Sequence, residues 1–192
     1  FFSNLSGNSK EINPFLFLNN NSLILQLLKT EIFNNKNLNF NLDINIDKIK
    51  NFQSFNQFVL KSKIKEGFID IDSTKLSWKK FIDFTIMDSL IYVKNGELIL
   101  DGKLDLNIKN YKKIYQFLLT PKNYRTEIKR VEVNFIYNFD QKIMNLNNVR
   151  VDNVTSENID EILNSLLFKN DKLQNKVYIK NILNKAIKSY AG

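Results

Sequence analysis

The feature that most constrains the fold of this chain is an alternation of apolar and polar residues after Gly96, with Ile99 as its exception. The apolar positions recur at every second residue, with Gly102 filling the one gap: Leu98, Leu100, Leu104, Leu106 and Ile108. A period of two places alternate side chains on opposite faces of an extended strand. The segment therefore predicts a long, half-buried β-strand with one apolar face and one hydrated face.

The same period recurs along the middle of the chain and predicts a sheet of about eight strands. Besides the strand described above, strands are expected in residues 40–46, 58–64, 69–71, 76–78, 82–86 followed by 90–93, 131–137 and 142–151, with a hairpin joining about 89–94 to 97–108. Asn95-Gly96 is typical of a type I′ turn, because both of its central positions need a positive φ. Consecutive strands joined by short turns favour an antiparallel sheet.

Asp101-Gly102 has two interpretations. It could form a second hairpin turn, or it could mark a β-bulge inside one long strand. The apolar phase is the same before and after the pair. We therefore favour the bulge.

Four segments have helical spacing of apolar residues. Ser22 can cap a helix over residues 23–33, residues 110–119 form a short helix that Pro121 ends, Ser156 caps a third helix, and a fourth covers 179–190.

The predicted fold class is α+β: a curved antiparallel sheet with an N-terminal helix, a short inserted helix and two C-terminal helices. We expect residues 1–192 to be a single domain or fragment, with a lead-in and helix in 1–36, the sheet in 37–153 and the last helices in 154–192.

The missing residue types exclude several classes of enzyme. The chain has no cysteine and no histidine, which rules out a Ser-His-Asp triad, a Cys-His pair and a histidine-ligated zinc site. Asp70 and Asp72 are paired carboxylates, but their alternation with Ile69 and Ile71 is more typical of a solvated sheet face than of an acid–base site. None of the five glycines fits a phosphate-binding loop. We expect a protein that is not an enzyme and uses no metal or cofactor.

The net charge of +8 suggests nucleic acid binding, but the composition argues against it. There are only three arginines, and the abundance of lysine, asparagine and isoleucine is typical of an AT-rich genome. The segment KNYRTEIKR at 122–130 is locally basic. It could contact phosphates or lipid headgroups, although a solvated loop before a strand is the simpler interpretation.

No segment is long and apolar enough to span a bilayer, because residues 15–28 are interrupted by three asparagines. The chain begins at Phe1 instead of methionine. We interpret it as an excised or processed piece, in which case an anchor or signal could lie upstream.

Residues 51–153 resemble the C-terminal region of AsmA-like proteins. The similar segments are LKSKIKEGFIDIDSTKLSW at 60–78, MDSLIYVKNGELILDGKLDLNIKN at 87–110, YKKIYQFL at 111–118 and IKRVEVNFIYNF at 128–139. They cover a little over half of the chain and consist of alternation patterns with glycines, without a catalytic residue.

This resemblance implies a non-enzymatic module of the bacterial envelope that handles phospholipid or supports outer-membrane assembly. It implies a periplasmic location, an inner-membrane helix outside this chain, and a curved sheet whose apolar side holds acyl chains. The candidate lipid-binding residues are Trp78, Leu98, Leu100, Leu104, Leu106, Val131, Val133 and Phe135. The alternative is a structural or protein-interaction domain with a closed core, in which the helices cover the apolar face.

Overall fold

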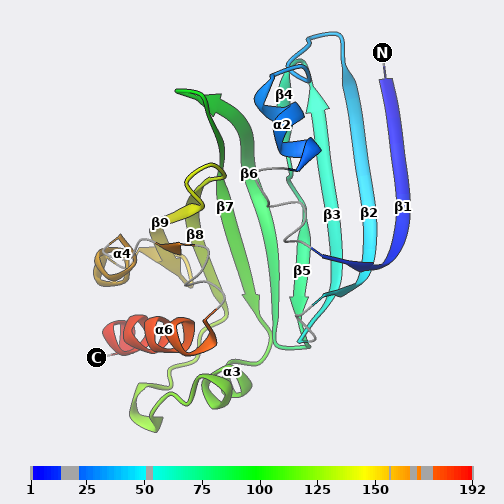
Figure 1. Cartoon of the computed structure of the whole chain (residues 1–192). Coiled ribbons are helices and arrows are strands. Elements are labelled where there is room, and N and C mark those ends of the chain that lie inside the picture. Colours follow the sequence, from blue (N-terminus) through cyan, green and yellow to red (C-terminus); the bar gives the residue numbers. More distant parts are fainter. Residues whose placement is uncertain are drawn as a thin grey trace.

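The computed structural model of this protein describes residues 2–13, 22–50, 54–155, 157–164, 168–169 and 175–191. Within these residues the fold is α+β, as predicted, with four helices and one large, mostly antiparallel sheet (Figure 1). The strands are β1 (Phe2–Ile12), β2 (Asn39–Ile49), β3 (Phe55–Lys65), β4 (Phe68–Asp70), β5 (Lys75–Trp78), β6 (Ile82–Lys94), β7 (Glu97–Ile108), β8 (Arg130–Asn138), β9 (Ile143–Val151), β10 (Val154–Thr155) and β11 (Phe168–Lys169). The helices are α2 (Leu23–Lys29), α3 (Tyr111–Leu118), α4 (Glu157–Asn164) and α6 (Lys176–Ala191), with a 3-10 turn η1 (Lys122–Tyr124).

The strands follow the order β1-β2-β3-β4-β6-β7-β8-β9-β10, while β5 pairs with both β3 and β6, and β11 pairs with β9. All eight predicted strands are present, as β2 to β9. Because the pairing from β2 to β9 is antiparallel, residues opposite each other across these strands share a face.

The interpretation of residues 1–21 as an irregular lead-in is wrong for residues 2–12. They form β1, which pairs with β2 in a parallel register, Phe2 opposite Asn39 and Ile12 opposite Ile49. The sequence FSNLSGNSKEI lacks apolar alternation, because β1 is an edge strand whose side chains are mostly exposed. Its pairing is made by backbone hydrogen bonds, which leave no periodic signature. Parallel strands need a crossover connection, and α2 lies within this one.

The hairpin between β6 and β7 is confirmed, with φ of 54° at Asn95 and 78° at Gly96. β7 is one continuous strand, as favoured, but the bulge lies in the partner strand. The register of β6 shifts between Met87 and Leu90, so β6 carries the extra residue opposite Gly102. The absent side chain of Gly102 makes room for this bulge, because an added Cβ would lie 3.1 Å from the Cβ of Ser89 and 3.2 Å from the ring of Phe135.

The helix ends follow the expected capping chemistry. The backbone N–H of Leu25 donates to the Ser22 hydroxyl at 3.2 Å, which confirms that cap, although α2 ends at Lys29, four residues before the expected end. The backbone N–H of Lys113 donates to Asn110 at the start of α3. The proposed Ser156 cap lies outside the described residues.

Two hydrophobic clusters fill the core, and both lie on the same face of the sheet. One joins β7, β8 and β9 to α3, α4 and α6, through Val133, Val151, Tyr115, Ile159 and Ile182. The other joins the opposite end of β7 and β8 to α2, through residues that include Leu25, Leu98, Leu100, Phe135 and Tyr137. Leu104 packs against both clusters. We call this region, over β7 to β9, the helix-covered face.

The same face continues across the N-terminal strands. Seven apolar side chains of this part are half-buried: Phe40, Leu42, Ile44, Phe58, Leu60, Leu76 and Phe84. The cross-strand pairs place the buried Ile46, Ile64 and Ile69 among them. We call these seven residues the N-terminal apolar face. The described helices pack on β6, β7 and β9, so the two parts of the face differ in what lies over them.

Candidate functional site

The structure places all eight candidate lipid-binding residues on one face of the sheet. Leu104 pairs with Val133 and Leu106 with Val131 across β7 and β8, and Phe135 lies opposite Gly102. Trp78 pairs with Ile82 at the end of β5. The alternation therefore correctly placed these residues together on one face of the sheet.

Most of these residues lie in the closed core. Leu98 is 1% exposed, and Leu100, Val133 and Phe135 are also buried. Leu104, Leu106 and Val131 are half-buried and pack against the cluster that α4 and α6 cover. In this arrangement protein atoms occupy the surface that an acyl chain would need.

Trp78 is buried by aromatic neighbours. Its ring makes edge contacts with Phe117 of α3 at 4.7 Å and with Phe81 at 5.5 Å between centroids. Trp78 therefore anchors α3 against the end of the sheet.

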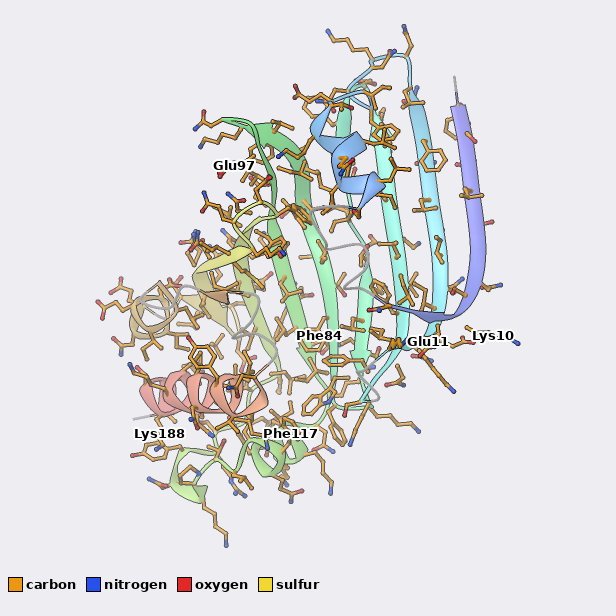
Figure 2. The ribbon with its side chains drawn as sticks, in the orientation of Figure 1. Lys10, Glu11, Phe84, Glu97, Phe117 and Lys188 are labelled. Atoms are coloured by element: carbon orange, nitrogen blue, oxygen red, sulfur yellow. The ribbon has the colours of Figure 1, made fainter. Side chains whose placement is uncertain are left out.

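The N-terminal apolar face has seven half-buried side chains, and the buried Ile46 and Ile64 lie between them. Ile44 pairs with Leu60, Phe58 with Leu76, and Leu76 with Phe84, so the row is continuous across four strands. Phe84 lies on β6, with the Phe55 ring of β3 at 6.2 Å (Figure 2). The sequence showed these residues with the same alternation, but nothing in the pattern distinguished them from the residues under the helices.

A single ion pair attaches α2 to the edge of the helix-covered face. The Lys29 ammonium contacts the Asp140 carboxylate at 2.6 Å, and the backbone N–H of Leu98 donates to the other oxygen of Asp140 at 2.8 Å. Partial burial opposes ionisation of Asp140, but the hydrogen bonds from Lys29 and Leu98 outweigh it and lower its pKa. A cavity of about 130 Å³ lies beneath α2, between Leu25, Phe139 and this ion pair.

The paired carboxylates Asp70 and Asp72 support the backbone. One oxygen of Asp72 accepts from both the backbone N–H and the hydroxyl of Ser89, at 2.7 and 2.6 Å, which holds the β6 bulge. Asp70 accepts from the backbone N–H of Asp72 at 3.2 Å, and burial raises the pKa of Asp70. These contacts explain both carboxylates as structural groups.

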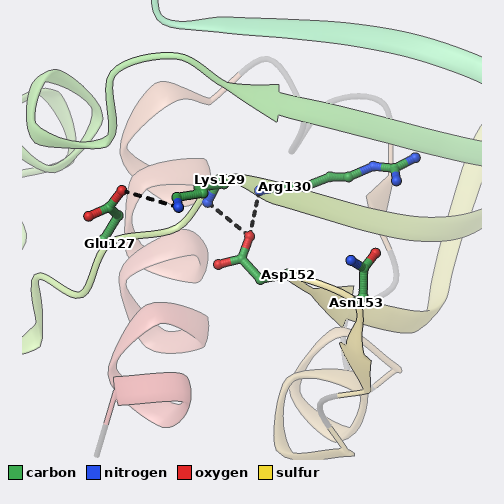
Figure 3. A pocket seen from close by; sticks show the side chains of 5 residues that line it. All are labelled: Glu127, Lys129, Arg130, Asp152 and Asn153. Atoms are coloured by element: carbon green, nitrogen blue, oxygen red, sulfur yellow. Dashed lines mark hydrogen bonds and ion pairs between the residues drawn. The ribbon is translucent and has the colours of Figure 1, made fainter.

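The basic segment 122–130 borders a shallow depression of about 420 Å³, shown in Figure 3. Asp152 accepts from the backbone N–H groups of Lys129 and Arg130 at 2.9 and 2.8 Å. The Arg130 guanidinium binds Asp105 at 2.7 Å, and this hydrogen bond raises the pKa of Arg130. The charged groups of the depression are thus largely engaged with each other and with the backbone.

The described residues contain no cluster of three or more side chains suited to hold a metal ion. None of the helices in the described ranges combines the length and apolar character that crossing a membrane requires.

A comparison of this chain with protein-family models, curated proteins and solved structures finds nothing that matches it. The resemblance to AsmA-like proteins therefore stays a prediction, and the functional argument depends on the geometry of the sheet.

Proposed function

We propose that this chain is a non-enzymatic lipid-handling module, of the AsmA-like envelope type, in which acyl chains bind on the N-terminal apolar face. The observation that carries the proposal is the continuous row of seven half-buried apolar side chains on β2, β3, β5 and β6. The candidate site thereby moves from the residues under the helices to the neighbouring strands of the same surface.

The dimensions of this row suit an acyl chain. Along β2 the apolar residues run from Phe40 to Ile46, which is about 20 Å at the usual rise of a strand. One leaflet of a bilayer's hydrocarbon core is about 15 Å thick. Each methylene that leaves water contributes about 0.8 kcal/mol, so a strand face can hold a lipid tail without a specific motif.

The opposite face of these strands supplies a hydrated exterior. Asn41, Asp43 and Asn45 alternate with the apolar residues of β2, and the Lys61 ammonium of β3 contacts Asp43 at 3.2 Å. The module would therefore present its apolar row to lipid and remain water-soluble on its other side.

The test is lipid extraction and mass spectrometry on protein purified without detergent. We expect bound phospholipid in the unaltered protein and its loss in Leu42→Gln and Leu60→Gln, with the circular dichroism spectrum retained. Ile136→Gln is the matched control, because Ile136 is an exposed apolar residue of β8 on the opposite face. Absence of lipid from the unaltered protein, or equal loss in the control, would contradict the proposal.

The second candidate is a structural or interaction domain with a closed core, and the burial of Leu98, Leu100 and Phe135 under α2 favours it. Leu104 lies between the two clusters, so Leu104→Asp would unfold the protein under either hypothesis. Leu60→Asp distinguishes them. The acyl-binding proposal expects a folded protein without lipid, whereas a closed core expects unfolding.

A further inference from the structure

The basic residues of this chain are concentrated at one end of the fold. Residues 109–130 and 175–191, which contain α3, η1 and α6, hold eleven lysines and arginines and one acidic residue, Glu127. The rest of the chain has seventeen basic and nineteen acidic residues. Codon bias acts on the whole gene, so it does not account for this segregation.

These segments form one surface. α6 packs against both α3 and η1, and the three lie together beside the end of the sheet (Figure 1). Lys188 of α6 and Phe117 of α3 both lie at this end (Figure 2). Asn184 of α6 fixes the junction, since its side-chain N–H donates to the Leu118 carbonyl at 2.7 Å. We call this region the basic helical end.

Most of its basic groups have no carboxylate partner among the described residues. Arg125 donates to the Thr120 carbonyl, and the ammonium groups of Lys112, Lys180 and Lys188 lie over aromatic rings. Lys109 and Arg130 bind Asp83 and Asp105. Within the described residues, six exposed basic groups and the half-buried Lys180 form no ion pair; the six are Lys112, Lys113, Lys122, Arg125, Lys185 and Lys188. Clustered, exposed and uncompensated positive charge attracts an anionic surface.

Exposed apolar side chains stand among these charges. Leu119 is 77% exposed, Val177 is 67% exposed and Phe117 is 44% exposed. Leu119 also has a φ of 60° and a ψ of 34°, the left-handed conformation at the end of α3 that normally favours glycine. The Leu119 backbone ends α3, with its N–H donating to the Gln116 carbonyl, whereas its exposed side chain adds little to the packing and is accessible to a partner.

We propose that the basic helical end docks on an anionic lipid bilayer, with its lysines at the headgroups and Leu119 inserted below them. A nucleic acid fits the surface less well, because such sites depend on arginines and on free aromatic rings for base stacking. Here the Phe117 ring, although 44% exposed, already contacts the Trp78 ring, and the Lys180 ammonium lies 4.2 Å from its centroid. Docking is independent of acyl binding on the N-terminal apolar face.

The test is co-sedimentation of the protein with vesicles of phosphatidylcholine, alone or mixed with phosphatidylglycerol. We expect binding to the mixed vesicles only, weakening with added salt. The triple variant Lys113→Gln, Lys185→Gln, Lys188→Gln should bind about a hundredfold less, and the same three positions changed to arginine should retain binding. Lys36→Gln, Lys48→Gln, Lys94→Gln is the matched control, because these exposed lysines lie elsewhere.

Leu119→Gly separates docking from folding. Glycine relieves the left-handed backbone, so the variant should unfold at a higher temperature while it binds the mixed vesicles about tenfold less. Unchanged binding by Leu119→Gly would overturn the insertion. No preference for phosphatidylglycerol, equal loss in the control triple, or tighter binding to single-stranded RNA than to vesicles would overturn the docking. The Leu42→Gln variant, which tests acyl binding, should still bind the mixed vesicles. The experiments therefore distinguish a failure of the acyl-binding proposal from a failure of the docking proposal.

Discussion

The helix-covered face and the N-terminal apolar face are built from the same alternation, yet they have different environments. On β7, Leu98 is 1% exposed beneath α2, whereas Leu42 of β2 is half-buried. Both are leucines on the same side of one sheet. Ile46, on the same face of β2, is only 2% exposed. A strand pattern therefore identifies which face is apolar but not how deeply each of its residues is buried.

The largest expected contrast between the two faces comes from deleting matched leucine side chains. Leu98→Ala should lower the free energy of unfolding by about 4 kcal/mol, because it leaves a cavity in a closed core. Leu42→Ala should lower it by about 1–2 kcal/mol, because a half-buried side chain loses less transfer free energy and its neighbours can relax. Urea unfolding measures both. Equal losses would mean that the N-terminal apolar face is as tightly closed as the other.

A second contrast compares two glycines on this face. Gly102→Ala should lower the free energy of unfolding by about 1–3 kcal/mol, because the new methyl group would lie 3.1 Å from Ser89 and 3.2 Å from Phe135. Gly7 of β1 has no atom within 4 Å of an added Cβ and no positive φ, so Gly7→Ala should change stability by no more than about 0.5 kcal/mol. Thermal unfolding monitored by circular dichroism tests the pair. A similar loss at Gly7 would show a neighbour packed on β1.

The smallest contrast concerns two ion pairs. Asp140→Asn removes the pair with Lys29 that holds α2 on the helix-covered face, and should cost about 1 kcal/mol. Asp43→Asn removes an exposed pair with Lys61 on the hydrated side of β2, and should cost about 0.5 kcal/mol or less. Urea unfolding of both variants at neutral pH gives the comparison.

The pH dependence of the Asp140 variant provides its internal check. The pKa of the Asp140 carboxyl is lower in the folded protein than its usual value of 3.8. The ion pair therefore contributes fully to the free energy of unfolding above pH 3.8, and this contribution is lost as the pH falls through the lowered pKa. The stabilities of the unaltered protein and Asp140→Asn should therefore converge in acid. A difference that persists there would assign the effect to packing instead of charge.

Most of the strands could be predicted from the sequence, and the reason is local. In β7, each polar residue between two leucines determines the phase of the strand, and Asn95-Gly96 has the backbone freedom that its turn requires. β1 could not be predicted, because an exposed edge strand such as FSNLSGNSKEI needs only backbone pairing and carries no apolar period. The strand that carries the bulge could not be predicted either. Gly102 interrupts the apolar pattern of β7, whereas the extra residue lies opposite it in β6.

The candidate site was predictable only in part. Periodicity placed Leu104 and Val133 on one face, and the structure pairs them directly. It did not distinguish Leu98 from Leu60, because both alternate with polar neighbours in the same way. The basic segment 122–130 was visible in the sequence, but its union with α6 was not, since more than forty residues separate the two segments.

By itself, the sequence determined that this chain forms an amphipathic sheet, because the side chains of a strand alternate between its faces whatever else the chain does. It also determined that histidine and cysteine chemistry play no part. Only the tertiary structure decided which stretch of the apolar face the helices bury, and that the basic residues of α3, η1 and α6 form one surface. Those outcomes depend on contacts between segments far apart in the chain, and no local pattern records them.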